Sequence, residues 1–188
     1  MLLRNYDLMC ALHQSTFTDK VIESIKAKIK NADGGSLNVA ATGIYPLSSF
    51  VNVNNTPGKG LYNILVVGSN DTPVSYDDVK INLISGLTGV SITDTQGVLN
   101  EDENIFENVL KVVYNNGNNE SVIIKEIGVY QGVSGTYATT AWQTLLYREV
   151  LETPIEVPSG ASVTISFTKR VSLNTNQPAD YVATASVE

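Results

Sequence analysis

Apolar and polar residues alternate near the C-terminal end of the chain in a pattern typical of β-strands. From Val163 to Phe167, valine, isoleucine and phenylalanine alternate with hydroxyl side chains. This period of two places apolar groups on one face of a sheet and polar groups on the other. The segments 122–131 and 144–158 precede it, with Gly/Ser-containing turns between them. We therefore expect three consecutive strands whose apolar members face one core, namely Ile127, Val129, Leu146, Val150, Ile165 and Phe167.

Further short apolar runs, bounded by turn residues, follow one another from residue 37 onward. Asn115 to Asn119 (NNGNN) is typical of a hairpin turn, because Asn and Gly tolerate positive φ. Many short strands with such turns predict a mainly β fold, an antiparallel β-sandwich or jelly roll. The expected strands are 37–45, 61–67, 79–84, 90–93, 105–114, 120–130, 143–151, 154–157 and 161–171.

The N-terminal residues carry helical periodicity and form a predicted helical appendage. Lysines lie mostly away from its apolar stripe, and the sequence NADGG (31–35) is expected to end the helix. This segment has more apolar surface than a lone appendage should expose, so it either folds back or docks on another chain. We favour docking, in which case removal of residues 1–35 leaves a folded β domain. The candidate interface residues of this segment are Leu8, Val21, Ile22, Ile25 and Ile29.

A chain of 188 residues suits one domain with appendages. We expect a helical attachment segment over 1–35, a β-sandwich domain over 36–171 and a C-terminal arm over 172–188. The arm is expected because the last stretch has few large apolar residues and a proline.

The composition is that of a globular protein, with 43% hydrophobic and 16% charged residues. A net charge of −7 argues against broad contacts with nucleic acid or with anionic lipid. Apolar runs are too short for a membrane span, and Arg4 and Asp7 interrupt what would be a signal sequence. The single Cys10 fits synthesis in a reducing cytoplasm.

Motifs that carry reaction chemistry are sparse. His13 is the only histidine, and its pairing with Cys10 is the only nucleophile and base at helical spacing; we interpret both as packed or surface residues. Asp77-Asp78 and Glu101 to Glu103 lack the spacing of a calcium loop and suit solvated turns. The sequence does not exclude a pair of carboxylates spaced for glycoside hydrolysis, because 19 acidic residues allow some pair to lie within reach. We expect no enzyme activity, no metal site and no cofactor.

Aromatic residues gather around the loop that follows residue 131. Tyr137 and Trp142 lie in or beside this loop, and Tyr130 and Tyr147 lie in the strands around it. Such residues pack on their own loop, anchor a protein interface or stack on sugars. Tyr137 and Trp142 are therefore added to the candidate interface residues.

Three segments together resemble a known family. IKEIGVYQ, LLYREVL and PIEVPSGASVTISFT are similar to the I-x-E-I-G-L/V-Y/F, LL-x-R-x-V-L and P-I-x-V-x-x-G-x-S-x-T segments of tailed-bacteriophage virion proteins. Residues 65–81 resemble the G-(S/T)-x-x-T-P-x-x-x-D-x-x-L stretch that precedes them. Ile81 or Val79 replaces the usual leucine, and Tyr147 replaces a residue that is more often small. The resemblance covers roughly residues 61–171.

The resemblance implies a structural protein of the virion, made in the host cytoplasm. We expect a non-enzymatic accessory protein on the head, neck or tail that binds other virion proteins and forms a homo-oligomer, with a trimer favoured. The alternative is a carbohydrate-recognition module that binds a host glycan. Neither nucleic acid nor a membrane is an expected partner.

Overall fold

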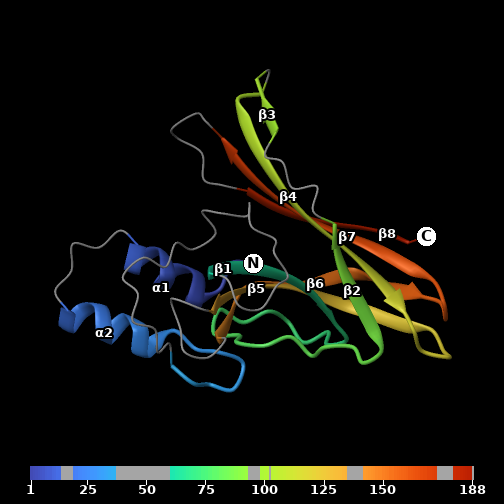
Figure 1. Cartoon of the computed structure of the whole chain (residues 1–188), viewed down its shortest axis with the longest axis horizontal. Helices are drawn as coiled ribbons and strands as arrows, with labels where there is room; N and C mark the ends of the chain where they lie inside the picture. Colours follow the sequence, from blue (N-terminus) through green and yellow to red (C-terminus); the bar gives the residue numbers. More distant parts are fainter. Residues whose placement is uncertain are drawn as a thin grey trace. The chain divides into compact units, whose positions relative to one another are not determined.

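The computed structural model describes residues 1–13, 19–36, 60–92, 98–101, 103–134, 142–172 and 180–187. As the sequence pattern predicts, the fold is mainly β, with two antiparallel sheets and a helical N-terminal part (Figure 1). Neither helix in the described ranges is long and apolar enough to cross a membrane. The elements are α1 (Arg4–His13), α2 (Asp19–Lys28), β1 (Gly60–Gly68), β2 (Leu87–Ile92), β3 (Val98–Asn100), β4 (Ile105–Asn116), β5 (Val122–Ser134), β6 (Trp142–Val157), β7 (Ser162–Ser172) and β8 (Asp180–Val187).

The first sheet has the strand order β1-β5-β6. The first residues of the chain add main-chain hydrogen bonds along β6. The Leu3 amide donates to the carbonyl of Leu146 at 2.9 Å, and the Arg148 amide donates to the carbonyl of Met1 at 3.1 Å. Residues 1–3 therefore extend this sheet beside β6, ahead of the first turn of α1.

The second sheet has the order β2-β4-β7-β8, and β3 also pairs with β4. Leu110 lies opposite Phe167 and Val112 lies opposite Ile165, so one face of the central strands is apolar. All four of these side chains are buried. Thr164, between two buried positions of β7, is half-buried, as expected from the alternation in the sequence.

The chain folds as two compact units, and the division between them falls within β5 and β6. Unit 1 comprises Met1–Leu83 and Lys125–Pro154, and unit 2 comprises Ile84–Ile124 and Ile155–Glu188. The boundaries differ from those expected: α1 and α2 belong to unit 1, and the expected C-terminal arm contains β8, which pairs with β7. Both terminal segments join sheets through main-chain hydrogen bonds. Such pairing does not depend on large apolar side chains, so the sequence composition did not predict it.

The expected core residues divide between the two units. Ile127, Val129 and Leu146 are buried in unit 1, and Ile165 and Phe167 are buried in unit 2. Val150, in β6, is half-buried. In unit 1, Leu3, Ile81, Tyr130 and Leu145 form one buried cluster, against which Ile64, Val66 and Val74 pack.

The helical segment is joined to the first sheet by the buried side chain of Asn5. Its Nδ2 donates to the carbonyls of Lys30 at 3.0 Å and Leu145 at 3.2 Å, and its Oδ1 accepts the Lys30 amide at 3.0 Å. The Thr144 hydroxyl also donates to the Lys30 carbonyl at 2.7 Å. The segment after α2 is thereby tied to both α1 and β6. This arrangement is that of a folded-back segment rather than of an independent attachment segment.

The expected hairpin at Asn115 to Asn119 is wrong. β4 and β5 flank it, but they pair in different sheets. The reason is the buried side chain of Asn116, whose Nδ2 donates to the carbonyls of Glu120, Val157 and Pro158 at 2.9, 2.9 and 3.1 Å. These bonds hold a turn in which the chain passes from one sheet to the other.

Two other expected strands are not seen as such. Residues 79–84 are not a strand, apart from a single bridge between Leu83 and Gly68. The expected strand 37–45 lies outside the described residues.

Candidate functional site

Unit 1 contains a buried ion pair between neighbouring strands. Glu126 in β5 is fully buried, and Arg148 in β6 is 2% exposed. The Nε of Arg148 donates to Oε2 of Glu126 at 2.7 Å. Burying a charge costs free energy of folding unless the charge is paired and hydrogen-bonded. The hydrogen-bond partners of both groups therefore decide whether either is available for chemistry.

The loop between β1 and residue 83 supplies the remaining acceptors for the guanidinium. Nη1 of Arg148 donates to Oδ2 of Asp78 at 2.7 Å, and Nη2 donates to the carbonyl of Thr72 at 3.0 Å. Asp78 Oδ2 also accepts the amide of Ser75 at 2.9 Å. Asp78 therefore caps the turn at Ser75 and is also the second carboxylate bound to the Arg148 guanidinium. The three side chains of Glu126, Arg148 and Asp78 form a triad.

The same loop supplies donors to the carboxylate of Glu126. Its Oε1 accepts the amides of Asn82 at 2.9 Å and Asn70 at 3.3 Å. Gly68 lies so close that a Cβ at this position would collide with Oε1 of Glu126 and with the carbonyl of Asn82. The fold thus needs glycine where the end of β1 passes the buried carboxylate.

The protonation state of the network follows from these bonds. Burial of the guanidinium opposes its charge, but the hydrogen bonds to Glu126 and Asp78 outweigh burial and raise the pKa of Arg148. Nearby, the hydroxyl of Tyr130 accepts the Ile81 amide at 2.9 Å. Burial raises the pKa of Tyr130 above its usual value, against the opposing effect of that hydrogen bond. Arg148 stays charged and Tyr130 stays neutral at physiological pH.

Chemically, this network holds a loop and does not present a reactive group. Both oxygens of Glu126 and all three nitrogens of the Arg148 guanidinium have partners within the chain. A general acid, a general base or a metal ligand needs an atom that can reach a substrate or an ion. We infer that the triad fixes residues 69–82 against β5 and β6.

The sequence analysis did not select Glu126 and Arg148 as site residues. The signal was present in the resemblance, because the patterns of the two strand segments each contain one fixed charged position among apolar ones. These positions are the E of I-x-E-I-G, which is Glu126, and the R of LL-x-R-x-V-L, which is Arg148; the D of T-P-x-x-x-D falls on Asp77, next to Asp78. The structure brings Glu126, Arg148 and Asp78 together.

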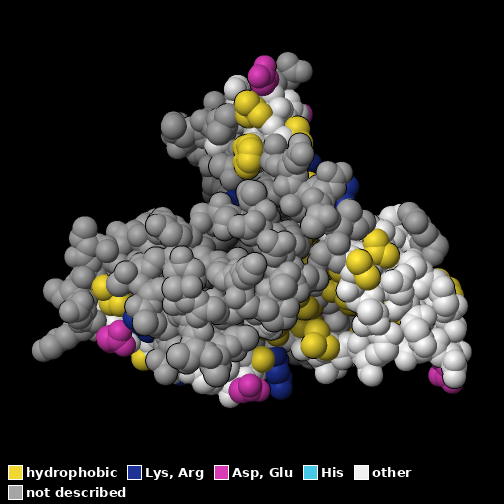
Figure 2. Space-filling model, viewed as in Figure 1, with side chains coloured by type: hydrophobic (Ala, Val, Ile, Leu, Met, Phe, Trp, Pro, Cys, Tyr) yellow, Lys and Arg dark blue, Asp and Glu magenta, His cyan; other side chains and the backbone are white. Residues whose placement is uncertain are grey.

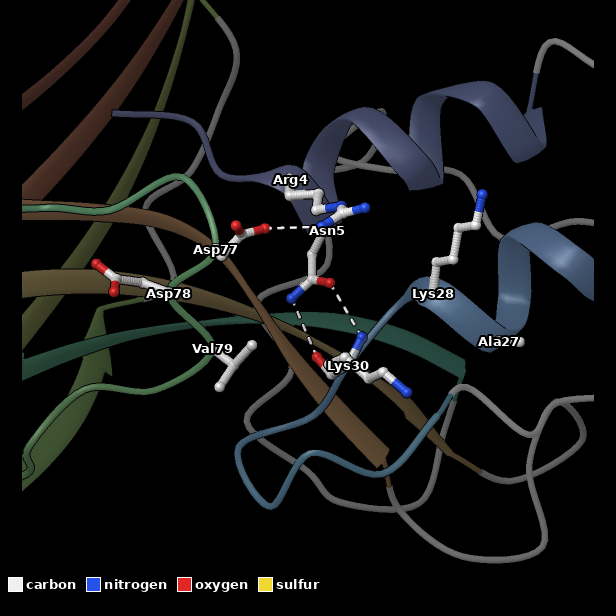
Figure 3. A pocket seen from close by; sticks show the side chains of 8 residues that line it. All are labelled: Arg4, Asn5, Ala27, Lys28, Lys30, Asp77, Asp78 and Val79. Carbon is white, nitrogen blue, oxygen red and sulfur yellow. Dashed lines mark hydrogen bonds and ion pairs between the residues drawn. The ribbon is translucent and has the colours of Figure 1, made fainter.

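A pocket of about 360 Å³ opens beside Asp78 (Figure 3). Arg4 and Lys30 contribute side chains from the two ends of the helical segment, and Asp77 contributes one from the loop. Nη1 of Arg4 pairs with Oδ1 of Asp77 at 2.9 Å, and Lys30 Nζ donates to Ser36 Oγ at 2.7 Å. The complete lining is Arg4, Asn5, Ala27, Lys28, Lys30, Asp77, Asp78 and Val79.

The predicted interface residues do not form one exposed surface among the residues whose side chains are described. Ile29 is fully buried, and Leu8, Ile22 and Ile25 are half-buried. The side chains of Val21 and Trp142 lie outside the description, and so does the whole of Tyr137.

The structure does not bring the other candidate reactive residues together into a site among the residues that it describes. Cys10 is half-buried, and the side chain of His13 lies outside the description. Glu101 and Glu103 are exposed at the turn between β3 and β4. Within the described ranges, no group of His, Cys, Asp or Glu side chains is arranged to hold a metal ion.

Comparisons with family models, curated proteins and solved structures gave no match.

Proposed function

We propose that this chain is a non-enzymatic structural component of a tailed-phage virion, docked on the head, neck or tail through protein–protein contacts. The observation that carries the proposal is the fate of the charged positions in the resembling segments. Glu126 and Arg148, the charged positions of the two strand segments, bond to each other, to the neighbouring Asp78 and to the main chain. A pattern whose charges hold its own strands together supports a scaffold role rather than a reactive one.

The surface of unit 2 supports a role in assembly. Several large apolar side chains are exposed on its strands, among them Val90, Val98 and Leu99 at 56%, 60% and 49%. Leu99 and its exposed ladder partner Phe106 are neighbours, and adjoining exposed apolar groups are typical of surfaces that bind other proteins. A structural component of a particle uses such surfaces to bind its neighbours.

Incorporation into particles tests the proposal. Virions from cells that carry the gene are banded in a density gradient, washed in high salt, banded again and probed with an antibody against the chain. We expect the chain to migrate with the particles in a constant ratio to the other virion proteins. A chain that stays with the soluble proteins at the top of the gradient contradicts the proposal.

Two variants of the chain give a matched control. Arg148→Met removes the buried charge and is expected to abolish incorporation by unfolding unit 1. Arg170→Met removes a charge from an exposed pair with Glu107, and it should be incorporated like the wild type.

No feature of the described residues specifically supports the alternative of a carbohydrate-recognition module. It depends on the aromatic loop near Tyr137, which lies outside the described residues. Quenching of tryptophan fluorescence by host polysaccharide would favour it over the structural role.

A further inference from the structure

An exposed apolar cluster lies where β3 pairs with β4. Leu99 and Phe106 are direct partners in this pairing, and Val98 lies opposite Glu107. Their exposed fractions are 60% for Val98, 49% for Leu99 and 36% for Phe106. Figure 2 shows hydrophobic side chains together at this end of β4. Val98, the residue before Leu99 in β3, faces the opposite side of the strand pair. We call Leu99 and Phe106 the apolar tip.

Carboxylates border the apolar tip. Glu101 and Glu103 are exposed in the turn that joins β3 to β4, and the sequence places Asp102 between them. Among the described residues, the side chains of Glu101 and Glu103 have no ion-pair partner. The tip therefore presents apolar groups beside uncompensated negative charge, and its partner must offer apolar contact beside positive charge.

The pocket of unit 1 has these properties. Ala27 and Val79 contribute apolar atoms to its lining, and Arg4, Lys28 and Lys30 contribute three of the chain's 12 basic residues. Lys28 is exposed and has no carboxylate partner among the residues described. Arg4 is paired with Asp77, so Lys28 and Lys30 are the cations of the lining without a carboxylate partner among the described residues.

We propose that the apolar tip of one copy of this chain docks into the unit 1 pocket of a second copy. The carboxylates of Glu101 and Glu103 reach the cations of the rim, and apolar side chains of the tip contact Ala27 and Val79. A small free anion fits less well, because Asp77 and Asp78 also line the pocket. The contact joins two different surfaces, so each copy can both donate a tip and accept one.

This inference rests on the proposed assembly function and names a second copy as the partner. The two can fail separately, because self-association is measured on the purified chain and attachment is measured on particles. A chain that attaches to particles but does not self-associate contradicts only this inference, and a chain that self-associates but does not attach contradicts only the proposed function.

Sedimentation velocity of the full chain, over a range of concentrations and at low and high salt, tests the proposal. We expect reversible self-association that weakens as salt screens the charges. The double reversal Glu101→Lys, Glu103→Lys and the single reversal Lys28→Glu should each weaken association by about 100-fold, since each places like charges together. All substituted residues are exposed, so the thermal unfolding curves should stay as in the wild type.

Mixing the two variants gives the decisive result. Each is expected to remain monomeric alone, and the mixture should associate because the intact tip of one meets the intact pocket of the other. Glu120→Lys and Lys80→Glu reverse exposed charges outside both surfaces and should associate like the wild type. A monomeric wild type, association that survives either reversal, or a mixture that stays monomeric overturns the proposal.

Discussion

Units 1 and 2 bury polar side chains to very different extents. In the part of the chain that the structure describes, Asn116 is the one buried polar side chain of unit 2, and the rest lie in unit 1: Asn5, Lys26, Glu126, Gln131, Thr144 and Arg148. The sheet of unit 2 is held by an apolar face whose period is visible in the sequence. Unit 1 is held by side chains that join a helix, a loop and two strands far apart in the sequence. Polar contacts of this kind specify one arrangement of distant segments, but they fail as a group when one member is lost.

Removal of residues 1–35 is expected to destabilise unit 1 more than substitution of Arg148 or of Gly128. It takes away Leu3 from the core of unit 1, Asn5 from its buried bonds and the main-chain pairing along β6. We expect hydrogen-exchange protection of β1, β5 and β6 to be lost. A folded domain with wild-type protection would instead support the attachment segment expected from the sequence.

Removal of residues 180–188 is the matched control at the other end of the chain. It deletes β8, which pairs with β7 and whose residues 184–187 are exposed. We expect a smaller loss of stability, with protection of β1, β5 and β6 unchanged.

Arg148→Met tests whether unit 1 depends on its buried charges. The change leaves the fully buried carboxylate of Glu126 without its counter-charge, so we expect a loss of about 3–5 kcal/mol in the free energy of unfolding. Arg170→Met, in an exposed pair, should cost about 0–1 kcal/mol. Urea unfolding measures both. The double variant Arg148→Met, Glu126→Gln should be more stable than Arg148→Met alone, and the absence of that recovery would contradict the assigned role of the ion pair.

Phe167→Ala tests the apolar face of unit 2. Phe167 is fully buried, and truncation to alanine should cost about 3–5 kcal/mol through the cavity that it leaves. Phe106→Ala, on the same sheet but 36% exposed, should cost clearly less. Equal effects on the denaturation midpoint would mean that the alternation does not define the core of this sheet.

Gly128→Ala makes the smallest of these changes and tests the packing inside unit 1. A Cβ at this position would collide with Cγ1 and Cδ1 of the buried Ile81 side chain, so we expect a loss of about 1–3 kcal/mol from overpacking. Gly117→Ala is the control, because its Cβ would meet only the Gly86 carbonyl at 3.5 Å. Thermal unfolding of the two variants should differ in midpoint, and identical curves would show that the close approach is tolerated.

The sequence predicted the β content and the alternation of β7 because both depend on local side-chain period. It did not predict that Asn116 would bond to the carbonyls of Val157 and Pro158, since such bonds depend on which distant segments meet. β8 was missed for a related reason: four of its eight residues, 183–186, are alanine, threonine or serine, and its register with β7 depends on which strand it meets. The candidate site was missed because a glutamate and an arginine inside strands do not reveal their partners until the fold brings them together.

The alternation of the two units along the chain has a consequence for synthesis on the ribosome. Residues 84–124, with β2 and β4, are made before Lys125–Pro154 completes unit 1, and β7 is made only after that. At about 5–20 residues per second, β4 waits roughly 2–10 s for its partner β7. During this interval the apolar face of β4, including Leu110 and Val112, lacks the strand that later pairs with it. The nascent chain is therefore most exposed to aggregation while unit 1 is closing, and this is the stage at which a ribosome-bound chaperone would have the greatest effect on yield.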